Sequence, residues 1–301
     1  MYSDIRKHKL FSYLVLIGFG LFLAAFVTAL TVYFGEGSYA IVPIAMGFSM
    51  ITSIITYYNS DKIVLKLNGA RPATRQEDLE LTNLLEGIVI ATGLPKPKLY
   101  VIDDMSMNAF ATGRNPENAV ICVTKGLMSK LDKYELEAVL AHELSHIKNY
   151  DILLSTVVAV MVGFVVVIAD MLTRSLFYRR RRSNNNNNGG AEGIIMIVSL
   201  VFIILSPISM KLMQLFMSRK REYLADASAI EITRKPDSLV SALAKISGDD
   251  DILEAANKST SHMYFSEPVK KLNKDGKRKR SAFMSTHPLI EDRIKAIREL
   301  N

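Results

Sequence analysis

Residues 141–151 read Ala-His-Glu-Leu-Ser-His-Ile-Lys-Asn-Tyr-Asp, and an apolar run, residues 152–173, follows directly. Two histidines four residues apart share one face of a helix, so the imidazoles of His142 and His146 can reach one ion. The apolar residues around them indicate a half-buried helix, in which unpaired imidazoles would be costly. The stretch therefore predicts a helix that carries a metal site close to an apolar run.

The glutamate beside the first histidine completes the pattern His-Glu-x-x-His. Zinc binds neutral imidazoles well. Glu143 points to one side of the histidines and can reach the coordination position that water takes, where a carboxylate can accept a proton from the water. The spacing thus predicts two zinc ligands and a general base for hydrolysis. The alternative is a solvated helix with two histidines that have no function.

A third protein ligand has to come from another part of the chain. The metzincin spacing requires a glycine at 149 and a ligand at 152, and it is excluded because Asn149 and Ile152 stand there. A glutamate on a second helix is the alternative. Five downstream glutamates are candidates: Glu222, Glu231, Glu254, Glu267 and Glu291.

Membrane topology favours one of these glutamates. His146 lies six residues before the third apolar run, and Glu222 lies six residues after the fourth, residues 194–216. An antiparallel hairpin would return the chain to the same membrane face and make the two residues neighbours. Asp226 follows one helical turn later and could accept the other N–H of a ligand histidine. The alternative is a surface ion pair between Glu222 and Arg219 or Arg221.

Four apolar runs, residues 11–34, 39–58, 152–173 and 194–216, are long enough to span a hydrocarbon core of ~30 Å. The first two are separated only by Gly35-Glu36-Gly37-Ser38 and form a predicted transmembrane hairpin. The alternative for the last two is a pair of buried helices in a soluble core, and their lengths argue against it. We expect about four transmembrane helices.

The net charge of +7 comes largely from basic residues that flank the apolar runs. Basic residues precede the first run and follow the second, so the positive-inside rule places residues 59–151 in the cytoplasm. Residues 179–182 are all arginine and break this rule if the last two runs both cross. No basic motif with interleaved aromatic residues is present, so we expect no nucleic acid partner.

The single cysteine, Cys122, excludes an intramolecular disulfide and a cysteine-based zinc cluster. It lies in a predicted strand, where an inert buried thiol is expected. Helices are expected at residues 74–93, 127–131, 133–149, 219–233, 236–247 and 288–300, strands at residues 98–103 and 118–124, and an extended segment at residues 108–113.

Four motifs in order resemble those of the HtpX family, bacterial membrane zinc endopeptidases of the heat-shock response related to the CAAX prenyl proteases. They are Asn-Ala-Phe-Ala-Thr-Gly at 108–113, His-Glu-Leu-Ser-His at 142–146, Arg-Glu-Tyr-Leu-Ala-Asp at 221–226 and Ser-Thr-His-Pro at 285–288. The resemblance covers nearly the whole chain.

The resemblance implies that His142, His146 and Glu222 bind one zinc ion per subunit. It implies further that Asn108 and His287 face the substrate near the metal, and we expect His287 to assist the oxyanion. In the family, damaged or misassembled membrane proteins are cleaved at cytoplasmic sites. We expect the substrate to lie along residues 108–112 as an added strand.

The predicted fold is a mainly α membrane protein with a gluzincin-like α+β zinc protease domain that contains a small sheet. Residues 1–58 form the first hairpin, 59–151 the first half of the protease domain, 152–217 a second hairpin with an Arg/Asn-rich loop, and 218–301 the second half. The expected location is the bacterial cell membrane, with the active site facing the cytoplasm. The sequence does not determine the oligomeric state.

Two other classes of protein remain open. One is a zinc-binding membrane scaffold without activity, but a structural site has no need of the base Glu143. The other is a transporter with an intramembrane zinc site, for which Asp170 and Lys211 are the only indications in the apolar runs.

Overall fold

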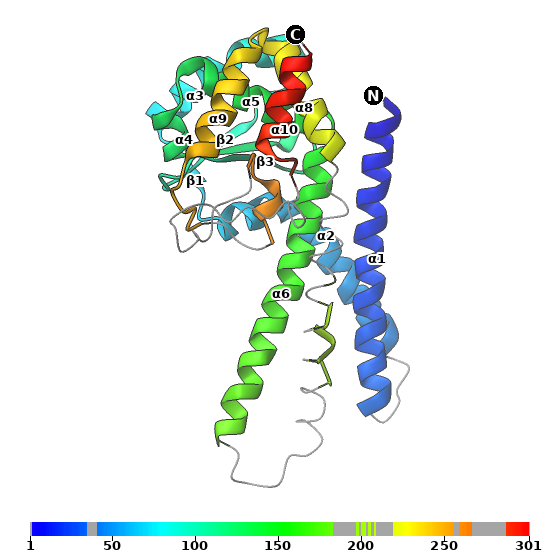
Figure 1. The fold of residues 1–301 in the computed structure, drawn as a ribbon. Coiled ribbons are helices and arrows are strands. Elements are labelled where there is room, and N and C mark those ends of the chain that lie inside the picture. Colours follow the sequence, from blue (N-terminus) through cyan, green and yellow to red (C-terminus); the bar gives the residue numbers. More distant parts are fainter. Residues whose placement is uncertain are drawn as a thin grey trace.

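The computed structural model describes residues 2–34, 41–182, 219–255, 259–266 and 287–300, together with scattered residues between 197 and 208. A globular part contains a sheet and several helices, and the long helix α6 projects away from it (Figure 1). Within residues 2–34 and 41–182, helices α1 (Tyr2–Phe34), α2 (Ile41–Leu67) and α6 (Asp151–Arg182) pack against one another.

The sheet has four strands in the order β1-β2-β4-β3. These are β1 (Arg71–Pro72), β2 (Lys98–Ile102), β3 (Ala109–Thr112) and β4 (Val120–Thr124). The pairing of β2 with β4 is parallel, and the other two pairings are antiparallel. Every residue of β4 is buried, as expected for a central strand rich in β-branched residues. The predicted buried thiol of Cys122 is confirmed, because Cys122 has no exposed surface.

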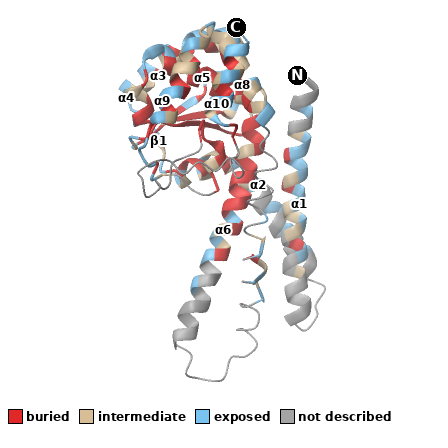
Figure 2. Ribbon diagram, in the orientation of Figure 1, coloured by how far each residue is buried: buried red, intermediate tan, exposed pale blue. Residues whose placement is uncertain are grey.

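Six helices complete the described globular part: α3 (Arg75–Thr92), α4 (Lys125–Lys130), α5 (Lys133–Lys148), α8 (Arg219–Thr233), α9 (Pro236–Gly248) and α10 (Ile290–Glu299). Val101, Ile121 and Val123 of the sheet share one core with α3, α5 and α9. The opposite face of the sheet packs against the ends of α2 and α6. The sheet is therefore buried on both faces (Figure 2).

Helix starts follow local capping chemistry. The side chain of Thr74 accepts a hydrogen bond from the backbone of Glu77, and Glu77 accepts one from the backbone of Thr74. Asp132 and Glu135 form the same capping box at the start of α5. Each box satisfies backbone N–H groups that a helix start leaves without partners. The helix predicted at residues 74–93 is thus confirmed, with Gly93 at φ 67° as its C-cap.

Two predicted boundaries differ from the structure. Helix α2 continues to Leu67, beyond the predicted hairpin end at residue 58. Helix α6 continues to Arg182, so the loop expected from residue 174 begins later. Both extensions contain no glycine or proline that would end a helix.

Among the described residues, one helical segment, Asp151–Asp170, is long and apolar enough to cross a membrane. A shorter apolar helical segment covers Lys9–Phe22. The fourth predicted run, residues 194–216, lies largely outside the described residues. Four spans therefore remain a prediction.

Candidate metal centre

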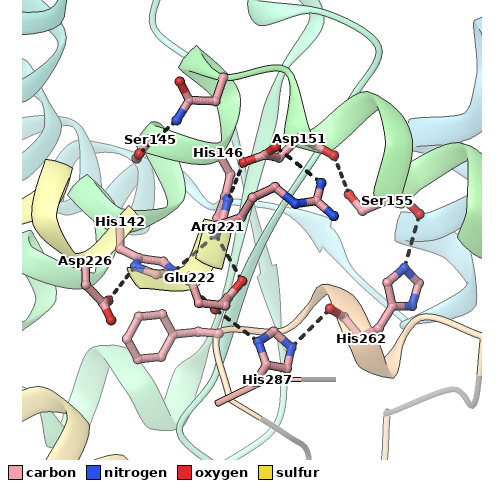
Figure 3. Close-up of polar contacts among 12 residues, drawn as sticks. His142, Ser145, His146, Asp151, Ser155, Arg221, Glu222, Asp226, His262 and His287 are labelled. Carbon is pink, nitrogen blue, oxygen red and sulfur yellow. Dashed lines mark hydrogen bonds and ion pairs between the residues drawn. The ribbon is translucent and has the colours of Figure 1, made fainter. Parts of the chain in front are cut away.

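Three side chains from two helices converge on one point. His142 and His146 lie on α5 and Glu222 lies on α8, although 76 residues separate His146 from Glu222 in the sequence. The Nε2 atoms of the histidines are 3.2 Å apart, and carboxylate oxygens of Glu222 lie 3.9 Å from His142 Nε2 and 3.7 Å from His146 Nε2. Figure 3 shows the three side chains pointing toward one another. The topological choice of Glu222 among the five glutamates therefore agrees with the structure.

The first histidine is held by a buried carboxylate. His142 Nδ1–H donates to Asp226 Oδ1 at 2.9 Å, one turn after Glu222 on α8. Arg293, on α10, donates two hydrogen bonds to the same carboxylate, at 2.6 and 2.8 Å. Asp226 therefore lies beside His142, one of the two predicted ligand histidines.

The second histidine has a similar partner. His146 Nδ1–H donates to Asp151 Oδ2 at 3.0 Å, and Arg221 Nη1 lies 3.4 Å from the other oxygen of Asp151 (Figure 3). Asp151 is the first residue of α6. The turn between α5 and α6 contains Tyr150, whose φ is 60°, and Asp151 follows it and contacts His146.

These hydrogen bonds decide which ring nitrogens carry protons. When both rings are neutral and both Nδ1 atoms donate to carboxylates, both Nε2 atoms present lone pairs to each other and to the anionic Glu222. Such a meeting of lone pairs is unfavourable unless a proton on one Nε2 atom or a metal ion lies between them. A tetrahedral ion with metal–nitrogen distances of 2.0–2.1 Å holds its ligands roughly 3.3 Å apart, close to the nitrogen separation here. The three residues fit a metal ion.

The pKa values of the three converging side chains differ from their ordinary values. Burial lowers the pKa of His142 to about 4, so this imidazole is neutral at neutral pH. Burial would lower the pKa of His146 as well, but the bond to Asp151 and the nearby carboxylates outweigh it and raise the pKa to about 9. Burial raises the pKa of Glu222, yet the charges of His287 and His146 hold it well below its ordinary value. Protons and a metal ion therefore compete for this site.

Glu143 lies beside the ligands without serving as one. Its side chain is buried, and among the described residues no hydrogen-bond partner reaches its Oε2. Burial raises the pKa of Glu143 to about 7, with Glu222 adding to the rise and His146 opposing it. A carboxylate with a pKa near neutrality, next to a metal site, is suited to accept and return a proton.

His287 reaches the site from the far end of the chain. Its Nδ1 lies 3.0 Å from Glu222 Oε2, and its Nε2–H donates to the backbone oxygen of His262 at 3.1 Å. The predicted approach of His287 to the metal ligands agrees with this placement. Both nitrogens have protein contacts, so contact with a substrate oxyanion would require one of these contacts to change.

A small cavity opens between the ligand residues. About 30 Å³ of it is open to the centres of water molecules, which is room for about one water. Four of the five histidines of the chain line it. His262 is one of them, and the sequence analysis missed it, together with Asp151, Arg221 and Arg293. The small number of histidines could have indicated His262 as a site residue, since His8 is the one histidine of the chain that does not line the cavity.

Asn108 does not lie among the residues that line the cavity. Its amide nitrogen donates to the backbone oxygen of Ser266 at 3.0 Å, and its side-chain oxygen accepts from the backbone of Ser266 at 3.2 Å. Asn108 is 3% exposed. In this structure its side chain holds the chain near Ser266, which differs from the predicted contact with substrate.

Part of the outer edge of β3, at Ala109 and Phe110, pairs with residues 259–266, here called the edge segment. Tyr264 pairs with Phe110 as an antiparallel bridge, and the backbone N–H of Phe265 donates to Ala109 at 2.7 Å. A substrate strand along residues 108–112 would therefore have to displace the edge segment. No sequence pattern predicts this pairing, because the two segments lie about 150 residues apart.

The indications for a transport site weaken in the structure. Asp170 is exposed and accepts a hydrogen bond from Arg174 at 2.8 Å, one turn further along α6. An i,i+4 ion pair on a helix surface is ordinary. Lys211 lies outside the described residues.

Comparisons with known proteins agree with this geometry. Residues 75–301 match Peptidase family M48. A protease HtpX homolog of Dictyoglomus thermophilum is 44% identical over 295 residues, which cover 98% of this chain and 92% of that protein. A protease HtpX homolog of Listeria monocytogenes is 37% identical over 309 residues, which cover 100% of both chains.

A crystal structure of S. mikatae Ste24p gives a TM-score of 0.48 at 20% identity, covering 96% of this chain, which spans 64% of the length of that one. The family match covers the residues that form the metal centre, and the HtpX relatives align over nearly the full chain. The chain therefore belongs to peptidase family M48, among the HtpX-type proteases, and is a metalloprotease.

Proposed function

We propose that the chain is a zinc-dependent endopeptidase of the bacterial cytoplasmic membrane. The observation that carries this proposal is the convergence of two histidine Nε2 atoms and the Glu222 carboxylate beside the buried Glu143. Two imidazoles and one carboxylate are a ligand set that catalytic zinc uses, with a position left for water. A zinc ion held there would polarise a peptide carbonyl and lower the pKa of a water molecule.

The residues of the chain then share the proton transfers. Glu143 accepts a proton from the water as the water oxygen attacks the carbonyl carbon of the peptide. Glu143 returns that proton to the amine as the carbon–nitrogen bond breaks, which leaves a carboxylic acid and an amine. Transfer of the acid's proton to the amine then gives the carboxylate and the ammonium ion. The pKa of about 7 of the buried Glu143 side chain supports both roles.

We assign supporting roles to three further residues. Asp226 fixes the ring of His142, as the bond of 2.9 Å indicates. His287 helps to stabilise the oxyanion, since it lies 3.0 Å from the ligand Glu222. Asn108 contributes to substrate binding indirectly, because it holds Ser266 and with it the edge segment that pairs with part of β3.

The substrates that we propose are misfolded or damaged membrane proteins, cleaved at cytoplasmic sites. The family and the apolar segment Asp151–Asp170, which starts five residues after His146, support this class. The role would be quality control under membrane stress. The same proposal divides the chain into four segments. Residues 1–58 and 152–217 form two membrane hairpins, and residues 59–151 and 218–301 form the two halves of the protease domain.

The test combines metal analysis with proteolysis in detergent. Wild-type protein reloaded with zinc should bind one zinc and cleave an unfolded membrane protein, and a chelator should abolish the cleavage. Glu222→Gln should lose both zinc and cleavage, because a neutral amide replaces the ligand carboxylate. Glu137→Gln is the matched control, since Glu137 lies on α5 but pairs with Lys235 outside the site. Wild-type cleavage that persists after complete removal of metal would contradict the proposal.

A further inference from the structure

The bond between His146 and Asp151 links the metal centre to the apolar helix α6. Asp151 is 8% exposed, and its carboxylate lies between His146 at 3.0 Å and Arg221 at 3.4 Å. Its partner His146 lies in the last turn of α5, close to the start of α6. The carboxylate therefore joins three helices: α5 by His146, α6 by its own backbone and α8 by Arg221.

Helix α8 supplies matching groups to both histidines. Glu222 faces both Nε2 atoms, Asp226 holds the Nδ1 of His142, and the neighbouring Arg221 contacts Asp151 on the Nδ1 side of His146. The Nδ1 atom of each of these histidines thus contacts a carboxylate, and each carboxylate also contacts an arginine: Arg293 for Asp226 and Arg221 for Asp151. The carboxylate that binds His142 belongs to Asp226 on α8, whereas the carboxylate that binds His146 belongs to Asp151 on α6.

We propose that Asp151 is a positioning residue that fixes the ring and tautomer of His146 for metal binding, and that it thereby ties the metal affinity of the site to the seating of α6. This inference rests on the zinc site of the proposed function. A carboxylate that accepts the remote N–H of a ligand histidine orients the ring and raises its basicity, and its loss typically lowers metal affinity about 10- to 100-fold.

A purely structural role for Asp151 is the competing explanation. An acidic residue at a helix start is favoured by the helix dipole in any case. The buried hydroxyl of Thr156 offers a comparison, because it contacts Thr112 Oγ1 at 2.9 Å and accepts from Gly113 N–H at 3.3 Å. These bonds seat α6 against β3 without contact to His146. Loosening α6 at Thr156 therefore separates general packing from a specific effect on the ligand.

The experiment measures zinc affinity in detergent by competition with a chelating indicator, and the absorption bands of the Co²⁺-loaded protein. Asp151→Asn should weaken zinc binding by about 10- to 100-fold and shift the Co²⁺ bands. Thr156→Val should lower the melting temperature and leave zinc affinity within about threefold of wild type. Asp170→Asn, which alters an exposed acid on the same helix, should change neither quantity.

Equal zinc affinity and equal Co²⁺ bands in wild type and Asp151→Asn would overturn the inference. Equal losses in Asp151→Asn and Thr156→Val would also overturn it, since packing alone would then explain them. If Asp151→Asn does not fold, Asp151→Glu is measured in the same way, and unchanged bands with unchanged affinity would refute the positioning role. A wild type that binds no zinc would overturn the zinc site of the proposed function as well.

Discussion

His287 contacts a metal ligand and a backbone carbonyl at the same time, which gives two explanations for its place in the site. In the first, it acts only through Glu222, whose pKa it helps to keep low. In the second, it also supports the developing oxyanion of the substrate, as proposed above. Both explanations require His287 beside Glu222, and they differ in whether activity per bound zinc depends on the imidazole.

We expect His287→Gln to lower kcat by about 100-fold per bound zinc, because losing one oxyanion donor typically costs that much. The measurement is kcat on a peptide substrate, divided by the zinc content of the same preparation. A loss of zinc with unchanged activity per zinc would show that His287 serves Glu222 alone.

At the residue scale, the sequence predicts part of the site. Helical spacing was sufficient for His142, Glu143 and His146, because one turn of helix fixes their relation. Hairpin topology selected Glu222. The partners Asp151, Arg293 and His262 were not predicted, because their approach depends on how α6, α10 and the edge segment pack around α5.

At the element scale, an ion cluster anchors the start of α3. Arg71, just before this helix, donates to both oxygens of Glu77 at 2.8 Å and also to Asp103, which follows β2. The hydrogen bonds from Arg71 to Glu77 are the main cause that lowers the pKa of Glu77 to about 2, and the bonds from Thr74 add to the effect. Burial of Glu77 opposes this shift only in part. The cluster fastens α3 to β1 and β2, so its charge state should affect the stability of the globular part.

The pKa of Glu77 is lower in the folded chain than its ordinary value of 4.5. The stabilisation is therefore complete above about pH 5 and is lost as the pH falls toward 2. We expect Glu77→Gln to lower the melting temperature at pH 7 and to flatten its decline in acid. The measurement is thermal unfolding in detergent between about pH 7 and pH 3. Parallel curves for wild type and variant would contradict this account of the cluster.

Helix prediction from the sequence was accurate where capping signals existed. Thr74 and Gly93 bound α3, as its caps predict. The helix predicted at residues 219–233 also matches α8 in its bounds. Helix prediction was less accurate for α2 and α6, because a hydropathy pattern marks where a membrane span ends and not where a helix ends. Both helices continue past the predicted spans, α2 to Leu67 and α6 to Arg182.

At the scale of the whole molecule, the sheet is buried between the protease helices and the ends of α2 and α6. The edge segment completes this arrangement through Asn68, near the end of α2. The side-chain oxygen of Asn68 accepts hydrogen bonds from Thr260 Oγ1 at 2.7 Å and from Tyr264 Oη at 3.0 Å. Phe265 in turn packs edge-on against the ring of the ligand His142. The end of α2 is thus connected to the metal centre.

We expect Asn68→Leu to loosen the edge segment, because two buried hydroxyls would lose their acceptor at a cost of about 1–3 kcal/mol each. Hydrogen exchange of the Phe265 amide, which donates to Ala109, should become faster. Asn59→Ala is the control, since Asn59 is a partly exposed residue of α2 that bonds only to nearby helix residues in the described structure. Unchanged exchange at Phe265 in Asn68→Leu would show that other contacts hold the segment.

The strands could be predicted from the sequence, but their order could not. Residues 98–103 and 118–124 are predicted strands. Nothing in either pattern indicates that these two strands pair with each other in parallel, or that β3 lies at the outer edge of the sheet. The pairing of β3 with the edge segment was equally hidden. Strand order and edge pairing depend on contacts between distant parts of the chain, which hydrophobic periodicity does not encode.

The central claim is that Glu143 is the base of a zinc-dependent peptide hydrolysis. The most direct test compares wild type, Glu143→Gln and the control Glu137→Gln on one unfolded substrate, at equal measured zinc content. We predict that Glu143→Gln binds zinc as wild type does and loses about 100- to 10,000-fold in kcat, while Glu137→Gln retains full activity. Cleavage by Glu143→Gln at the wild-type rate, with equal zinc, would contradict the account.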